Sequence, residues 1–334
     1  MARLCSVITM SHSPFLFIDG ERWGQIRKLR DRPGRYAPDA PVDSAEENLA
    51  KQARCARALA ELRAQLEAAR PDVLIVFGDD QDEQFSPANT PALAVYAGPQ
   101  FAGYRVSRFD GVPLPDTVRA ERPRTSEHWA GAPGYPEFAR HLTGGLVLGG
   151  FDPALMQSLP VPDEGMSHAI MRPLHCLRPG FDLPTVPVFV NCYHGPRPTA
   201  RRCYELGRAV RELIESWPSD ERVAVIGSGG LWHTPLDAGA TIDERFDADI
   251  CAAVQSGRAQ IMAAVFDQGL APSQGNSHAG AGTAMDLGYG SGTGETRNWV
   301  AAAAAADATP GVVVDSVPIW ASPVGVAFAY WPLA

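Results

Sequence analysis

Four short apolar segments recur along this chain, and each is followed directly by polar residues. They lie at residues 4–9, 73–77, 185–191 and 222–230. Stretches with hydrophobic residues at helical spacing separate them, so strands alternate with helices. This alternation predicts a three-layer α/β fold, in which a mostly parallel central sheet has helices on both faces and the active site lies at the carboxyl ends of the strands.

Clear helix signals accompany these strands. Ser44 and Glu47 form an S-x-x-E capping box, and Leu59, Leu62 and Leu66 follow at helical spacing. We expect further helices and two late strands. The helices lie at 199–216, 242–255, 258–267 and from about residue 297, and the strands at 312–315 and 326–331.

Other segments lack a regular period. Residues 86–159 are rich in Pro, Gly and Arg, which predicts an insertion or cap over the sheet within a single catalytic domain of residues 1–334. Residues 19–43 are expected to form a loop or lid. The glycine-rich segment 288–295 lacks the lysine and the glycine spacing of a phosphate-binding loop, so we discount it as one.

The composition excludes several classes of partner. The formal net charge is -9, from 29 Lys and Arg against 38 Asp and Glu, which argues against binding to nucleic acid or anionic lipid. The six cysteines form no C-x-x-C pair, and we find neither a signal peptide nor a stretch long enough to span a bilayer. We therefore expect a cytoplasmic protein that does not bind membranes.

Polar residues follow each of the four predicted strands. They are His12, the acidic segment 78–85, His194 and His233. Because the carboxyl ends of parallel strands share one edge of a sheet, these residues are expected to converge in one crevice. Each also has a plain structural explanation: a single histidine is more often held by hydrogen bonds, an acidic run often faces water, and His233 serves a structural role at least as readily.

A carboxylate follows the last of these strand ends. Glu244 opens a helix shortly after the segment GSGGLWHTP. Histidine and carboxylate ligands with open coordination positions are typical of mononuclear ferrous sites. The pattern therefore indicates a non-haem iron centre.

Six stretches in matching order carry a resemblance to a known family. They read SHSPFL, EGMSHAIMRPL, VPVFVNCYHGPRPTARRCYELG, VAVIGSGGLWHTP, IDERFD and GETRNWVAAAAA. The sequence resembles the catalytic subunit of the class III extradiol ring-cleavage dioxygenases, the protocatechuate 4,5-dioxygenase group. The resemblance covers most of the chain and is weakest over residues 86–159. It implies an Fe(II)-dependent enzyme that cleaves a catechol or a 2-aminophenol with O2 in aromatic catabolism.

The resemblance also implies roles for particular residues. His12 matches the first iron-binding histidine, and Glu244 matches the carboxylate ligand. His194 matches an acid/base histidine next to the metal ligands, and His168 matches a pocket histidine that transfers protons or contacts oxygen and substrate. Glu295, at the start of the alanine-rich helix, is expected to fix a loop by hydrogen bonds.

The second iron-binding histidine is missing. Aligning on Phe85 places Gln81 at its position, whereas a gap would place Asp80 there. A glutamine carbonyl is a harder and weaker donor than imidazole, so the site should hold iron less tightly or recruit another group, such as Asp82, Glu83 or, from the insertion, His128. A carboxylate-rich site would favour Mn(II) or Mg(II) over Fe(II).

Two other functions stay open at this point. The scaffold can serve a metal-dependent lyase or hydrolase that does not use O2, because fold and descent do not fix the reaction. Alternatively, the chain is a non-catalytic, metal-poor subunit of a hetero-oligomer. For the enzyme itself we expect either a homo-oligomer or a complex with a small companion subunit.

Overall fold

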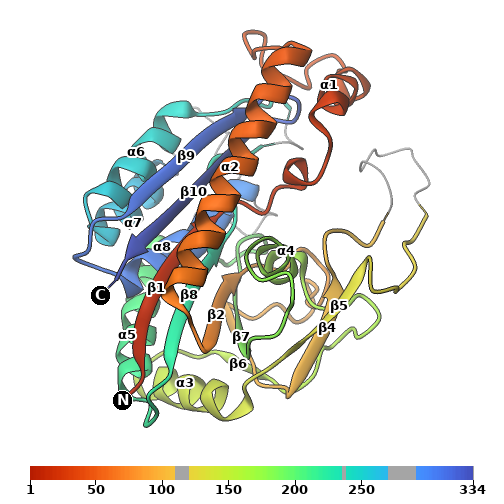
Figure 1. Cartoon of the computed structure of the whole chain (residues 1–334). Coiled ribbons are helices and arrows are strands. Elements are labelled where there is room, and N and C mark those ends of the chain that lie inside the picture. Colours follow the sequence, from red (N-terminus) through yellow and green to blue (C-terminus); the bar gives the residue numbers. More distant parts are fainter. Residues whose placement is uncertain (110–119, 235–237, 270–290, 334) are drawn as a thin grey trace.

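The computed structural model describes residues 1–109, 120–234, 238–269 and 291–333, and its core is an eight-stranded sheet (Figure 1). The strand order is β6-β3-β7-β2-β8-β1-β10-β9. The strands are β1 (Arg3–Met10), β2 (Val73–Gly78), β3 (Leu93–Tyr96), β6 (Ala154–Met156), β7 (Thr185–Val190), β8 (Arg222–Ser228), β9 (Val312–Ile319) and β10 (Val324–Pro332).

The centre of this sheet is parallel and its two flanks are antiparallel. Strands β7, β2, β8 and β1 run parallel to one another. Strand β10 pairs antiparallel with β1 and with β9, and β3 pairs antiparallel with β7. The predicted three-layer α/β fold is confirmed, and all four predicted strand ends belong to its parallel centre.

Helices cover both faces of the sheet. One face carries α1 (Trp23–Arg30), α2 (Ala45–Ala69) and α4 (His168–Leu177). The opposite face carries α3 (Pro136–Leu148), α5 (Ala200–Ser216), α6 (Glu244–Gln255), α7 (Ala259–Gly269) and α8 (Thr296–Ala305). None of the helices in the described ranges is long and apolar enough to cross a bilayer.

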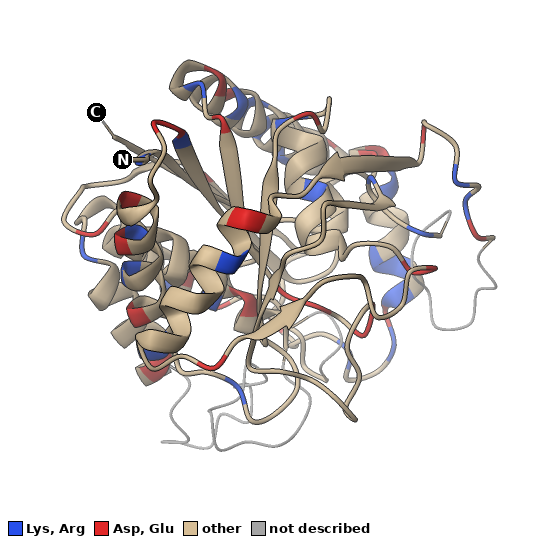
Figure 2. Ribbon diagram, turned by 90° about the horizontal axis from the view of Figure 1, so that it is seen from below, with Lys and Arg blue, Asp and Glu red and all other residues tan. Residues whose placement is uncertain are grey.

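Alternate side chains of each central strand enter opposite cores. In β2, Leu74 and Val76 pack under α2 and α4, whereas Ile75 and Phe77 pack on the other face, and all four are fully buried. This double burial explains why the strand reads as a continuous apolar run instead of an alternating one. Figure 2 shows charged residues of both signs mainly on the outer helices and loops, with the central strands largely free of them.

The predicted capping box is present at the start of α2. The Ser44 hydroxyl accepts a hydrogen bond from the backbone amide of Glu47 at 3.2 Å. The Glu47 carboxylate accepts one from the backbone amide of Ser44 at 2.7 Å. These two bonds satisfy amides that the first helical turn leaves free. The helix ends at Arg70, whose φ of 45° is left-handed.

Two irregular segments contain more structure than the sequence indicated. Residues 19–43 include the short turn η2 (Gly20–Arg22) and helix α1, with Trp23 and Ile26 buried against the sheet layer. Residues 86–159 contribute β3 and β6 to the main sheet, and also the separate hairpin of β4 (Gln100–Tyr104) and β5 (Trp129–Pro133). The expectation of a cap laid over the sheet is therefore wrong for β3 and β6. Of the discounted segment 288–295, residues 288–290 lie outside the described ranges.

Candidate metal centre and active site

Three ionisable side chains meet at the carboxyl edge of the parallel strands. His12 follows β1, Asp79 follows β2, and Glu295 ends the short turn η3 (Gly292–Glu295) that leads into α8. Their candidate ligand atoms all lie within 4.8 Å of one another. The three residues are 3%, 0% and 1% exposed, so water contributes little to their solvation.

The imidazole of His12 is held from both sides. Its Nδ1 lies 2.8 Å from the hydroxyl of Ser228, the last residue of β8, and its Nε2 lies 3.3 Å from Glu295 Oε2. When Nδ1 donates its proton to Ser228, Nε2 keeps its lone pair and faces the carboxylates. This arrangement is the one that metal-binding histidines adopt.

The carboxylate of Glu295 is surrounded by donors. Oε2 accepts a hydrogen bond from the backbone amide of Gly230 at 2.8 Å. Oε1 accepts one from the side-chain amide of Gln81 at 3.1 Å and another from the hydroxyl of Tyr193. A carboxylate with this many donors is fixed in position and favoured in its ionised form.

Opposing effects act on the pKa of Glu295. Burial raises the pKa, but the charges of His12 and His233 and the hydrogen bonds of the site lower it further, so the net pKa lies well below the usual range. Glu295 therefore stays ionised and provides a negative oxygen next to the His12 imidazole.

Asp79 is the least compensated member of the cluster. Its Oδ1 accepts a bond from the Asn298 side-chain amide at 3.3 Å, and its Oδ2 is buried without a hydrogen-bond partner among the described residues. Burial, followed by the negative charge of Glu295, raises the pKa of Asp79 well above its usual range. A divalent cation between these groups would remove this penalty, so the donor set fits a bound metal ion.

A second histidine borders the cluster. The ring of His168 meets the ring of His12 edge-on, with centroids 4.8 Å apart. Its Nδ1 lies 2.8 Å from Glu83 Oε1, which also accepts the His168 backbone amide at 3.0 Å at the start of α4. Burial raises the pKa of Glu83, but the charge of His168 and hydrogen bonds from His168 and Ser167 bring it down to about 2.

His233, which follows β8, also contacts the cluster. Its Nε2 lies 3.6 Å from Glu295 Oε1, and its backbone amide donates to the Thr293 hydroxyl at 2.9 Å. The sequence left open both a structural role and a role next to the metal ligands for this residue. The structure places its imidazole beside a candidate ligand, where it can exchange a proton with a bound molecule.

A buried cation supports the same edge of the sheet. Arg172 of α4 donates from Nη1 to the backbone carbonyl of His12 at 2.9 Å and from Nε to the carbonyl of Val106 at 2.7 Å. Burial lowers the pKa of Arg172 to about 10, against the raising effect of Glu83 and Glu295. The guanidinium therefore partly balances the acidic groups around it.

Gln81 reaches the cluster in a different way from that expected. Its Nε2 donates to Tyr193 at 2.8 Å and to Glu295 at 3.1 Å. An amide nitrogen has no lone pair to offer a metal, so in this arrangement Gln81 positions a candidate ligand. Direct ligation by Gln81 stays a prediction that these contacts do not support.

The alternative at Asp80 is also occupied by local contacts. Its two carboxylate oxygens accept the backbone amides of Gln84 at 2.9 Å and Phe85 at 3.0 Å. Burial and the nearby Glu83 raise the pKa of Asp80 to about 7. Asp80 thus shapes the turn after β2, while its neighbour Asp79 joins the cluster. His128 lies elsewhere, with its Nε2 3.9 Å from Glu127.

Two other residues that the sequence singled out lie outside the cluster. Glu244 is exposed in the first turn of α6 and, within the described residues, forms no hydrogen bond or ion pair with His12. His194 pairs through Nε2 with Asp82 Oδ1 at 2.7 Å. The carboxylate beside His12 in the structure belongs to Glu295, for which the sequence indicated a loop-fixing role, and the ligand role of Glu244 stays a prediction.

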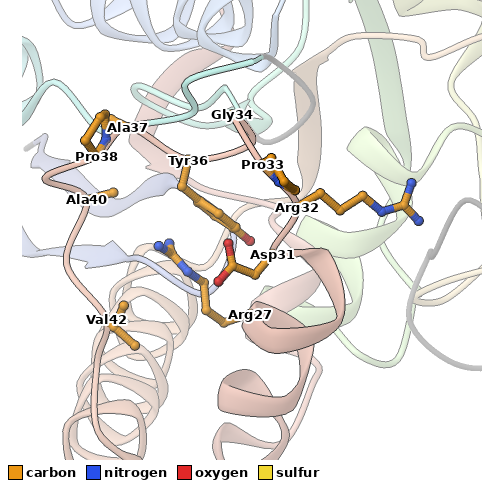
Figure 3. A pocket seen from close by; sticks show the side chains of 10 residues that line it. All are labelled: Arg27, Asp31, Arg32, Pro33, Gly34, Tyr36, Ala37, Pro38, Ala40 and Val42. Carbon is orange, nitrogen blue, oxygen red and sulfur yellow. The ribbon is translucent and has the colours of Figure 1, made fainter.

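A separate hollow lies on the α1 side of the molecule (Figure 3). It has a volume of about 480 Å³ and is formed by the end of α1 and the loop that follows. Tyr36 lies over the Arg27 guanidinium, 3.3 Å from its central carbon to the ring centroid. Arg27 also donates to the carbonyl of Trp320 at 2.9 Å. This hollow contains none of the cluster residues.

The protein has a three-layer α/β fold, with a buried imidazole and two buried carboxylates at the strand ends of its sheet. These groups can hold a divalent metal ion. The chain belongs to the family described as the catalytic LigB subunit of aromatic ring-opening dioxygenase, whose model matches residues 40–320. The class III extradiol dioxygenase resemblance drawn from the sequence is thereby confirmed.

Curated relatives match parts of the chain. A gallate dioxygenase of Pseudomonas putida is 35% identical over 103 residues, which cover 30% of this chain and 29% of the relative. A 2,3-dihydroxyphenylpropionate/2,3-dihydroxicinnamic acid 1,2-dioxygenase of Photorhabdus laumondii is 39% identical over 97 residues, 29% of each chain. The corresponding protein of Klebsiella pneumoniae strain 342 is 25% identical over 178 residues, 53% of this chain and 48% of the relative. The chain thus spans half or less of the length of these relatives.

One solved structure resembles the overall chain. It is the uncharacterized protein JW3007 from Escherichia coli K12, at 15% sequence identity and a TM-score of 0.44. The match covers 82% of this chain and 91% of that protein.

Proposed function

We propose that this protein is a metal-dependent dioxygenase that opens the ring of a catechol or 2-aminophenol with O2. The observation that carries the proposal is the buried cluster of His12, Asp79 and Glu295 at the strand ends of a LigB-family chain. Fe(II), which the resemblance implies, is the first ion to test. The partners proposed are the aromatic substrate and O2, with either a second copy of the chain or a small companion subunit.

Each residue of the site has a role in this proposal. The metal, when bound by His12, Asp79 and Glu295, supplies the Lewis acid and the path for electrons between ring and oxygen. Glu83 accepts a hydrogen bond from the Nδ1–H group of His168, so Nε2 of that ring keeps its lone pair and can take a proton from a substrate hydroxyl. His233 lies on the other side of the cluster, next to Glu295, and can return a proton to the product.

His194 remains the acid/base residue that the sequence resemblance predicts. Its contact with Asp82 holds the imidazole by one nitrogen, as Glu83 does for His168. We also propose that the protein works as a single catalytic domain in a reducing cytoplasm, since all six cysteines are free thiols and five of them are buried.

The test is oxygen uptake by anaerobically purified protein reconstituted with Fe(II), measured with a panel of catechols and 2-aminophenols. We expect uptake together with a ring-opened product. No uptake from protein shown to contain its metal would refute the proposal and would favour a lyase or hydrolase that does not use O2. Protein that binds no metal would favour a non-catalytic subunit.

A pair of matched variants identifies the carboxylate ligand. Glu295→Gln and Glu244→Gln change the same functional group, but Glu295 lies buried in the cluster and Glu244 is exposed on α6. We expect Glu295→Gln to lose metal and oxygen uptake and Glu244→Gln to retain both. The reverse result would support the ligand role that the family resemblance implies for Glu244.

A further inference from the structure

We infer that Asp79 is a metal ligand of this protein and that the resulting set of one nitrogen and two oxygen donors shifts the metal preference of the site toward Mn(II). The inference deepens the proposed function, on which it rests for the presence of a metal at this cluster.

One carboxylate oxygen of Asp79 has an unmet bonding requirement. Its Oδ2 is fully buried and has no hydrogen-bond partner in the described part of the chain. Its Oδ1 receives one long bond, 3.3 Å, from Asn298. A buried carboxylate without partners is strongly unfavourable, so such a group calls for an explanation.

The position of this carboxylate supplies the explanation. Candidate ligand atoms of His12, Asp79 and Glu295 lie within 4.8 Å of one another, which is close enough for one ion to contact all three. The Asn298 amide is itself anchored, because its nitrogen also donates to the Ser228 carbonyl at 2.8 Å. Asp79 is thus held next to the imidazole and carboxylate with one oxygen left for a cation.

Gln81 explains why the set is rich in oxygen donors. The structure presents its amide nitrogen to Tyr193 and to Glu295, at 2.8 and 3.1 Å. Because an ionised carboxylate only accepts hydrogen bonds, the nitrogen and not the carbonyl must face Glu295. Gln81 therefore fixes a ligand, and among the described residues the cluster of His12, Asp79 and Glu295 contains a single imidazole.

The chemistry of the donors sets the metal preference. Imidazole suits iron and zinc, whereas carboxylate oxygen suits manganese and magnesium. Two carboxylates also balance the full charge of a divalent ion, and they reduce the advantage that nitrogen donors give to the later metals. We therefore expect the site to bind more Mn(II) relative to Fe(II), from an equimolar mixture, than a site with a second imidazole would bind.

The ligand role of Asp79 is tested with Mn(II) alone. Apo-protein is titrated with Mn(II), and the free ion is followed by its electron paramagnetic resonance signal. Substitutions outside the ligands typically weaken metal binding 10- to 100-fold, so we expect Asp79→Asn to weaken it by about 100-fold or more. Asp163→Asn, which changes the same functional group on a side chain that is 90% exposed, is the matched control and should bind Mn(II) like the parent.

A melting measurement separates a ligand from a structural carboxylate. Apo Asp79→Asn should melt no lower than the apo parent, because the substitution removes a buried, uncompensated acid. It should also lose most of the rise in melting temperature that Mn(II) gives the parent. Parent-like Mn(II) binding, or a lower melting temperature of the apo variant, would overturn the ligand role.

The metal preference is tested by competition. Apo-protein is incubated anaerobically with equimolar Mn(II) and Fe(II), separated from free metal, and analysed by mass spectrometry for both elements. We expect the bound Mn:Fe ratio of the parent to fall about tenfold in Gln81→His, because that variant adds an imidazole. A ratio that Gln81→His leaves unchanged or raises would overturn the preference.

These measurements do not use enzymatic turnover. Protein that binds Mn(II) through Asp79 but consumes no O2 with any substrate would refute the proposed function and leave this inference intact. Protein that consumes O2 equally well with Asp79 or Asn at position 79, and binds Mn(II) equally in both, would refute only the inference.

Discussion

Replacing Glu83 with glutamine isolates the carboxylate that holds His168. The Glu83 carboxylate accepts bonds from the Ser167 hydroxyl at 2.6 Å, the His168 amide at 3.0 Å and His168 Nδ1 at 2.8 Å. In Glu83→Gln the charge is lost, and an amide nitrogen faces at least one of these donors. The substitution should therefore destabilise the first turn of α4 and loosen the orientation of the His168 imidazole.

The pKa gives the size of the effect on stability. A carboxyl group with a pKa near 2, against an ordinary value of 4.5, gains roughly 3 kcal/mol from its partners in the folded protein. The Glu83 side chain is 25% exposed, so water screens part of this interaction energy. We therefore expect Glu83 to stabilise the folded protein by about 2 kcal/mol. Because the folded-state pKa is lowered, this stability is present above about pH 4.5 and is lost as the pH falls toward 2.

Urea unfolding of the metal-free protein measures this difference. At pH 7 we expect Glu83→Gln to lower the free energy of unfolding by about 2 kcal/mol, and the gap from the parent to narrow between pH 4.5 and 2. The control is Glu127→Gln, whose side chain is 81% exposed and lies 3.9 Å from His128. Glu127→Gln should lower the free energy of unfolding by less than about 0.5 kcal/mol. Equal losses in the two variants at pH 7 would refute the reasoning.

Three further predictions concern two histidines and the serine that holds His12. General acid/base residues contribute about 10²- to 10⁴-fold to turnover, and we expect His233→Ala to lose this much because its Nε2 is 3.6 Å from the Glu295 carboxylate. His194→Ala should lose a similar factor if the sequence-based role is right; parent-like turnover at saturating substrate would exclude it. Ser228→Ala should weaken Mn(II) binding by about 10- to 100-fold, since Ser228 fixes His12 through Nδ1, and titration of the apo-protein against the parent checks this.

The sheet could be predicted from the sequence because its central strands are buried on both faces. Their runs of apolar residues are long enough to stand out, and the capping box marks the start of α2 in the same way. Strands β3 and β6 could not be found, because three or four residues carry no measurable period. Helix α1 could not be predicted either, because its buried residues Trp23 and Ile26 lie among charged neighbours in the sequence.

The candidate site was predicted only in part. His12 follows a recognisable strand, so its place at the sheet edge could be inferred. The choice between Glu244 and Glu295 could not, because a carboxylate in the first turn of a helix already has a favourable interaction with the helix dipole. Asp79 lies in a run of acidic residues, and only the backbone turn after β2 decides which of them points inward.

The parallel pairing of β1 with β8 has a consequence for how the protein matures. Met10 pairs with Ser228 in this register, which places His12 beside the Ser228 hydroxyl, and Glu295 arrives only when α8 docks on the same layer. Ligands so far apart along the chain cannot gather in an unfolded polypeptide, so the ion cannot nucleate folding as zinc does in small zinc-dependent domains. The polypeptide should therefore fold first and take up metal afterwards, and a chelator should remove the ion reversibly without unfolding the sheet.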